Sequence, residues 1–186
     1  MSDLELAVVL GSTRPGRNGK AVADWVMEQA AERSANYELI DLADHALPFI
    51  DEPIPPSVGM YSNEHTKAWS EVVARFDGFV FVTPEYNHST SAVLKNALDY
   101  LYAEWNNKAA AFVGYGAAGA LRAVEHLRSI ASELQMAHVR QQVSFQIMQD
   151  FEEYRIFKPR PVHAPMAATM FDQLEAWAGA LKPLRA

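Results

Sequence analysis

The chain has 186 residues, of which 49% are hydrophobic and 21% charged, so it can form a buried core and is not a disordered protein. Sixteen basic and 23 acidic residues give a formal net charge of −7, which argues against a general nucleic-acid or anionic-membrane binder because either would need a basic face. The absence of cysteine excludes disulfides, thiolate nucleophiles and iron–sulfur clusters, and it fits a cytoplasmic protein.

Apolar segments along the chain predict strands and helices in alternation. Five short runs are typical of buried strands, at residues 4–10, 37–42, 78–83, 108–113 and 138–145. Five other segments have apolar residues at helical spacing, at residues 18–33, 63–76, 91–102, 120–134 and 165–181. Two proline-bearing segments, 43–60 and 149–164, are predicted to be surface excursions near a site or interface. We therefore predict one α/β domain over residues 1–186, a three-layer sandwich with helices on both faces of a five-stranded parallel sheet.

Ligands of such sheets bind beyond the carboxyl ends of the strands, and three loops that leave predicted strand ends have unusual sequences. The first loop, GSTRPGRNG at residues 11–19, opens a helix, so its backbone N–H groups lie at the positive end of that helix. Ser12 adds a hydroxyl donor, and Arg14 and Arg17 add positive charge. We interpret this loop as a phosphate-binding site; the alternative is a glycine turn with two solvated arginines.

Two better-known phosphate loops fit this segment poorly. The dinucleotide pattern G-x-G-x-x-G requires a glycine at the position of Thr13. The P-loop pattern requires a lysine and then a serine or threonine at the positions of Arg17 and Asn18. The first loop is therefore not predicted to be either of them.

The second loop, TPEYNHSTS at residues 83–91, provides a flat face and a hydroxyl from Tyr86. Asn87 and the amides after it could donate to the edge of a planar, polar ring. The alternative is an ordinary strand-to-helix loop in which Ser89 or Ser91 caps the helix.

The third loop, GYGAAGALR at residues 114–122, contains three glycines, which would let a flat ligand lie close to the backbone. Arg122 is expected in the first turn of the next helix. Its alternative role is a salt bridge with Glu125 or Glu85.

Together the three loops resemble the NADPH-dependent FMN reductase family of the flavodoxin-like fold. The resemblance covers residues 4 to about 128 and rests on GSTRPGRNG, PEYNHSTSAVLKNALDYL and GYGAAGALRAVEHLR. It implies a sheet order of 2-1-3-4-5 and FMN as the bound cofactor. The chain departs from the family pattern at Ser91, where a proline is usual, and at Gly119-Ala120, where a glycine pair is usual.

The resemblance also implies a set of site residues. The FMN phosphate would lie on Ser12, Arg14, Arg17, Asn18 and Gly19. The isoalloxazine ring would lie against Pro84, Glu85, Tyr86 and Asn87, with Tyr115, Gly116 and Gly119 covering its pyrimidine side. His88 and Arg122 are candidates for contact with the substrate or NADPH.

The implied activity is hydride transfer from NADPH or NADH to FMN, and then electron transfer to a quinone, azo compound, metal oxyanion or similar small acceptor. No catalytic acid or base is assigned, because the cofactor carries out the chemistry, and no metal site is predicted. The resemblance also implies a homo-oligomer, either a dimer or a tetramer; no nucleic-acid or membrane partner is expected. Two alternatives stay open: an FMN-binding electron carrier that reacts poorly with NADPH, and a non-catalytic regulatory module on the same fold.

Overall fold

The computed structural model of the protein describes residues 4–185. A five-stranded parallel sheet lies at its centre, in the order β2-β1-β3-β4-β5. The strands are β1 (Glu5–Leu10), β2 (Asn36–Asp41), β3 (Gly78–Pro84), β4 (Ala109–Gly116) and β5 (Ala137–Gln146). The predicted fold class and strand order are therefore confirmed.

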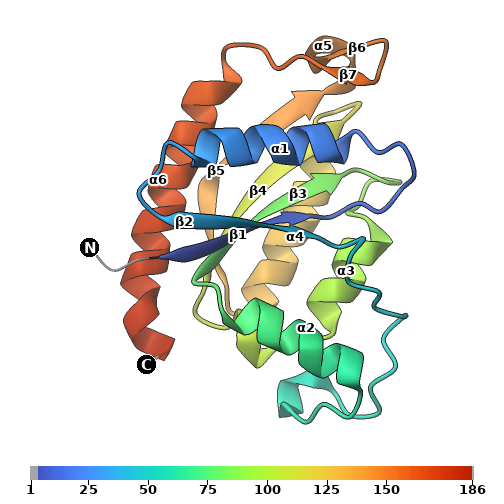
Figure 1. Ribbon diagram of the computed structural model, residues 1–186, viewed down its shortest axis with the longest axis vertical. Helices are drawn as coiled ribbons and strands as arrows, with labels where there is room; N and C mark the ends of the chain where they lie inside the picture. Colours follow the sequence, from blue (N-terminus) through green and yellow to red (C-terminus); the bar gives the residue numbers. More distant parts are fainter. Residues whose placement is uncertain (1–3, 186) are drawn as a thin grey trace.

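Helices cover both faces of this sheet, as Figure 1 shows. One face carries α1 (Gly19–Ala30) and α6 (His163–Leu181), and the other carries α2 (Glu64–Ala74), α3 (Ala92–Asp99) and α4 (Leu121–Glu133). Side chains alternate along β1, so that Leu6 and Val8 contact the first layer while Ala7 and Val9 contact the second. Because both faces are covered, the central strands are apolar at nearly every position.

Two elements near the site do not end at the predicted residues. β4 extends to Gly116 rather than to residue 113, because its pairing with β3 continues to Tyr115 and its pairing with β5 continues to Gly116. α3 ends at Asp99 rather than at residue 102, and a 3-10 turn at Ala103–Trp105 follows it. The loop that leaves β4 therefore begins three residues further along the chain than the sequence pattern predicts.

The two proline-bearing segments differ in how far they follow the prediction. Segment 43–60 is irregular, apart from a 3-10 turn at Pro56–Val58. The segment after β5 is more ordered, with α5 (Ile147–Asp150) and a hairpin of β6 (Phe151–Glu152) and β7 (Ile156–Phe157). The prediction of a surface excursion at 149–164 is wrong in part, because the carboxylate of Asp150 and the ring of Phe151 are buried.

Asp150 anchors this hairpin to the rest of the molecule. Its carboxylate accepts hydrogen bonds from the Gln146 backbone N–H at 2.8 Å and from Arg160 Nε at 2.8 Å, and it lies 2.8 Å from His163 Nε2. Burial raises the pKa of Asp150, but the Arg160 guanidinium and the other donors outweigh burial and hold that pKa at about 2. The ionised carboxylate thus joins the end of β5, the hairpin and the start of α6.

Within residues 4–185, no helix combines the length and the apolar character needed to cross a bilayer.

Candidate functional site

The predicted loops converge on one cavity at the carboxyl edge of the sheet. Its volume is about 730 Å³. The first loop lines it with residues 14–18, the end of β3 with Pro84, Glu85 and Tyr86, and the end of β4 with Tyr115 and Gly116. Ala21 of α1, Ile147 and the hairpin residues Tyr154 and Arg155 complete the lining. We call this space the main cavity.

The N-terminus of α1 meets a buried hydroxyl at one side of the main cavity. A Cβ atom at Gly19 would lie 2.4 Å from the Tyr115 hydroxyl oxygen, so only glycine fits at that position. Among residues 4–185, the Tyr115 hydroxyl has no hydrogen-bond partner. Burial raises the pKa of Tyr115 and outweighs the nearby Ser12 side chain, which lowers that pKa, so the hydroxyl stays protonated and can donate. A buried donor without a partner next to a positive helix end fits an anionic oxygen of a ligand.

The two arginines of the first loop have different surroundings. Arg17 is paired with Asp41 at the end of β2, at 2.5 Å and 2.9 Å, and it also donates to the Ser12 carbonyl. Among residues 4–185, the side chain of Arg14 makes no hydrogen bond or ion pair, and it is exposed at the main cavity. Arg17 therefore fixes the shape of the loop, and Arg14 is the arginine whose charge is available to a ligand.

Two other residues of the first loop connect it to neighbouring segments. The buried Ser12 hydroxyl lies 3.1 Å from the Tyr86 hydroxyl. The Asn18 amide donates to the Tyr154 carbonyl at 2.8 Å, which ties the hairpin to the start of α1. The hairpin therefore forms one wall of the main cavity.

The second loop turns sharply at Asn87 and His88. Both residues have left-handed φ values, 49° and 70°, and the turn is closed by two backbone hydrogen bonds between Tyr86 and Ser89, at 2.9 Å and 3.1 Å. Asn87 lines a neighbouring groove beside Ser89 rather than the main cavity. Ser91 accepts from the Leu94 N–H at 3.2 Å, so of the two caps that the alternative offered, Ser89 or Ser91, it is Ser91 that caps the following helix.

Glu85, His88 and Arg122 form one polar cluster. The nearly buried Glu85 carboxylate is ion-paired with Arg122 and accepts from the backbone N–H groups of Arg122 and Ala123, at 3.1 Å and 3.3 Å. Arg122 Nη1 lies 3.0 Å from His88 Nε2. The predicted alternative for Arg122, a salt bridge with Glu85, is confirmed. Burial raises the pKa of Glu85, but Arg122 and the two N–H groups outweigh burial, so the pKa lies below its ordinary value and Glu85 is ionised.

The glycines of the third loop have separate functions. A Cβ atom at Gly114 would lie 2.5 Å from the Gly119 carbonyl, so Gly114 allows the loop to fold back onto β4. Gly119 has a φ of 67°, which favours glycine. A Cβ atom at Gly116 would meet its nearest atoms at an ordinary 3.7 Å, and Gly116 lines the main cavity. Of the three, Gly116 is the one placed to let a ligand approach the backbone.

Several residues of this site were not predicted from the sequence. Asp41 holds Arg17, and the main cavity is also lined by Pro15, Ala21, Ile147, Tyr154 and Arg155. Only Asp41 had a signal that could have been used, because an acidic residue at the end of a strand next to β1 can reach an arginine in the first loop. Among residues 4–185, no group of three or more histidine and carboxylate side chains is arranged to hold a metal ion.

Comparison with known proteins identifies the family. The profile of the NADPH-dependent FMN reductase family matches residues 4–150, and the chain belongs to this family of oxidoreductases, which use FMN and NAD(P)H. An NAD(P)H-dependent FMN reductase of Schizosaccharomyces pombe is 44% identical over 135 residues, covering 71% of this chain and 68% of that protein. A 2-hydroxy-1,4-benzoquinone reductase of a Burkholderia species is 31% identical over 145 residues, covering 74% and 75%.

The fold has counterparts among solved structures. The flavoenzyme NAD(P)H:(acceptor) oxidoreductase of Paracoccus denitrificans superposes with a TM-score of 0.70 at 20% sequence identity. The match covers 97% of this chain and 98% of that one. At this identity the likeness bears on the fold alone.

Proposed function

We propose that the main cavity holds FMN and that the protein is an NAD(P)H-dependent reductase of quinones or similar small acceptors. The observation that carries this proposal is the buried, unpartnered Tyr115 hydroxyl beside Gly19, at the positive end of α1. Arg14 supplies an available positive charge at the same edge of the cavity. When bound, FMN supplies the chemistry, since it takes a hydride from NAD(P)H and passes two electrons to the acceptor.

The residues of the chain are proposed to bind and orient the cofactor rather than to take part in the chemical step. The FMN phosphate is proposed to be held by Ser12, Arg14, Asn18 and Gly19. Arg17 fixes the shape of their loop through its ion pair with Asp41. The isoalloxazine ring is proposed to be lined by Pro84, Glu85, Tyr86, Tyr115 and Gly116. Gly119 shapes the third loop next to them, and Asn87 and His88 lie in the adjoining turn. Glu85 is ionised and held by Arg122, so it is not suited to donate a proton.

The acceptor class follows from the relatives. The Burkholderia relative is named for the reduction of a benzoquinone, and a relative of 30% identity from Solanum tuberosum is named NAD(P)H:quinone oxidoreductase. The azo compounds and metal oxyanions that the sequence resemblance implies stay within the proposal as further acceptors.

We also propose that residues 1–186 form a single domain that assembles as a homodimer or homotetramer in the cytoplasm. The two hydrophobic clusters lie on opposite faces of one sheet, which supports one folding unit. Large apolar side chains are exposed at Leu121, Met148 and Trp177, with 50%, 70% and 49% of their surface accessible. Exposed apolar surface of this kind is typical of subunit contacts.

Steady-state oxidation of NADPH tests the proposed function. Protein loaded with FMN should oxidise NADPH when 1,4-naphthoquinone is supplied, and the rate should depend on both the flavin and the quinone. A protein that retains FMN without oxidising NADPH would instead be an electron carrier. A protein that does not retain FMN would be a regulatory module, and either result contradicts the proposal.

A further inference from the structure

The hairpin of β6 and β7 brings two residues to the main cavity, Tyr154 and Arg155. It follows β5 and lies at the carboxyl edge of the sheet (Figure 1). The hairpin begins at Phe151, past residue 150, where the match to the family profile ends. Membership of the family therefore assigns no function to the hairpin, and its own contacts indicate what it does.

Aromatic packing fixes the base of the hairpin. The centroid of the Phe157 ring on β7 lies 4.9 Å from that of Phe145 on β5 and 5.0 Å from that of Phe151 on β6. The same ring makes an edge contact with Trp25 of α1, at 6.5 Å between centroids. Contacts of this kind stabilise a structure beyond the area that they bury. The base of the hairpin is thereby packed against both the sheet and α1.

Polar contacts hold both the base and the tip of the hairpin. At the base, the buried Asp150 carboxylate accepts from Arg160 Nε and lies 2.8 Å from Nε2 of the buried His163. At the tip, the Asn18 amide donates to the Tyr154 carbonyl at 2.8 Å. Asn18 is the residue before α1, so the tip of the hairpin is fastened beside the first loop.

The tip is a tight turn, closed by a hydrogen bond of 3.0 Å from the Arg155 N–H to the Glu152 carbonyl. The central residues of this turn, Glu153 and Tyr154, have left-handed φ values of 49° and 60°, which asparagine and glycine adopt more readily. A backbone conformation that its own residues disfavour is held by the surrounding structure, and such positions are frequent in segments that contact ligands.

The Arg155 side chain is exposed at the main cavity, and among residues 4–185 it makes no hydrogen bond or ion pair. The Arg14 side chain on the first loop is likewise unpaired, so two separate segments each supply a free guanidinium to one space. The carboxylate in the lining, that of Glu85, is already paired with Arg122. This local excess of positive charge, in a chain with a net charge of −7, indicates an anionic ligand.

We propose that Arg155 is a specificity-determining residue that binds the phosphate monoester of a nucleotide ligand, and that His163 is a positioning residue that holds the hairpin through Asp150. This proposal rests on the proposed function, which supplies two ligands with such a group, FMN and NADPH with its 2′-phosphate. Riboflavin and NADH lack that phosphate. A guanidinium binds phosphate oxygens through two parallel hydrogen bonds, which the analogues without the phosphate do not offer.

Two comparisons test Arg155 and distinguish the two phosphates. Flavin-free protein is titrated with FMN and with riboflavin, followed by flavin fluorescence, and FMN-saturated protein is assayed for the KM of NADPH and of NADH with 1,4-naphthoquinone. In Arg155→Ala, FMN affinity should fall about tenfold with riboflavin affinity unchanged, or the KM of NADPH should rise about tenfold with that of NADH unchanged. The first result assigns the FMN phosphate and the second the 2′-phosphate. Arg155→Lys, which keeps the charge without the planar fork, should lie between Arg155→Ala and the wild type.

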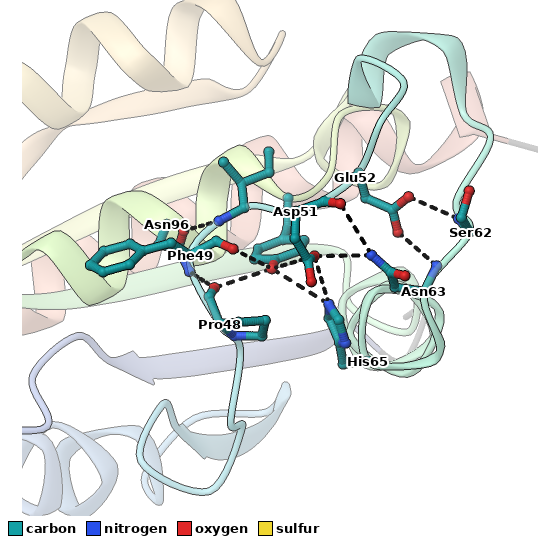
Figure 2. A network of polar contacts seen from close by, with 10 residues as sticks. Pro48, Phe49, Asp51, Glu52, Ser62, Asn63, His65 and Asn96 are labelled. Carbon is teal, nitrogen blue, oxygen red and sulfur yellow. Dashed lines mark hydrogen bonds and ion pairs between the residues drawn. The ribbon is translucent and has the colours of Figure 1, made fainter.

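Variants of His163 test the positioning function. His163→Phe keeps a ring beside Phe145 but removes the contact with Asp150, and it should reduce the preference for the phosphate-bearing ligand about threefold. His163→Gln, which keeps a donor, should restore the preference. Figure 2 shows a second aspartate–histidine pair, Asp51 and His65 at 3.0 Å, and neither residue lines the main cavity. His65→Phe is therefore the matched control and should leave the preference unchanged.

Equal affinities for all four ligands in Arg155→Ala and the wild type would overturn the proposal. So would equal losses with and without the phosphate, since Arg155 would then support the shape of the cavity. A full preference in His163→Phe would overturn the positioning function. If the wild type binds FMN without oxidising NADPH, the proposed function fails, and the two flavin titrations decide on Arg155. If it does not bind FMN, both proposals fail.

Discussion

The Tyr115 hydroxyl is the residue-level feature that most directly indicates a bound anion. A buried hydroxyl without a partner costs about 1–3 kcal/mol relative to a satisfied one. Tyr115 bears this cost in the described structure, at a place where the N-terminus of α1 and the free side chain of Arg14 converge. We infer that the cost is offset when a phosphate oxygen accepts from this hydroxyl.

Tyr115→Phe should therefore affect the two states of the protein in opposite directions. Without FMN, the variant should be as stable as the wild type or more stable, because no hydrogen bond is lost and an unsatisfied group is removed. With FMN, it should bind the cofactor more weakly. Urea unfolding of the flavin-free protein and fluorescence titration with FMN measure both. A variant that is destabilised without FMN and binds it normally would show that the hydroxyl serves the fold.

Arg14→Ala should weaken FMN binding by about 1.5–3 kcal/mol, because it removes a charge-assisted contact to the phosphate. Its effect on stability should be small, since Arg14 is exposed and makes no ion pair among residues 4–185. Arg140→Ala, which removes an exposed arginine outside the main cavity, is the control. Unchanged FMN affinity in Arg14→Ala would refute the phosphate assignment of the first loop.

At the scale of elements, the sequence predicted the strands and the loops that leave them. Of the contacts between loops, it offered only the Arg122–Glu85 salt bridge, as one alternative. The glycine, arginine and hydroxyl residues at 11–19 predicted a ligand-binding loop from local sequence alone, without knowledge of contacts between distant residues. The Arg17–Asp41 ion pair could not be predicted from local sequence, because it depends on the pairing of β2 with β1, which places Asp41 opposite Leu10. The hairpin after β5 was missed because its order comes from a buried carboxylate, and polar, proline-bearing sequence is also typical of irregular segments.

The Asp150 anchor makes a pH-dependent contribution to stability. The folded-state pKa, about 2, lies below the ordinary value of 3.8, so the folded state binds fewer protons than the unfolded state between these values. The contribution is present above pH 4 and is lost as the pH falls toward 2, by about 2 kcal/mol in total. Urea unfolding at a series of pH values measures it. Asp150→Asn should remove this part of the pH dependence; an identical slope in the variant would show that other carboxylates cause it.

At the scale of the whole molecule, the parallel sheet separates the two ends of the protein. The carboxyl ends of the strands bear the main cavity. At the opposite end, Asp77 is paired with Lys182 at 2.8 Å and with Arg185 at 2.5 Å, and it accepts from the Glu5 N–H at 3.0 Å. These contacts fasten the C-terminal turn to the amino ends of β1 and β3.

Asp77→Ala should lower the free energy of unfolding by about 3 kcal/mol, because it removes a carboxylate that pairs with Lys182 and Arg185 and accepts from the Glu5 N–H. FMN affinity should not change, because Asp77 lies at the amino ends of the strands and does not line the main cavity. Urea unfolding and FMN titration of the same preparation test both statements. A matching loss of FMN affinity would show that the two ends of the sheet are coupled.

The central claim is that this chain holds FMN in the main cavity and reduces it with NAD(P)H. The visible absorption spectrum of the protein, loaded with FMN and freed of unbound flavin, before and after anaerobic addition of NADPH, tests it most directly. We expect the bands of bound oxidised flavin to be present and to bleach when NADPH is added. Bands that persist after NADPH, or a protein that keeps no flavin, would contradict this account.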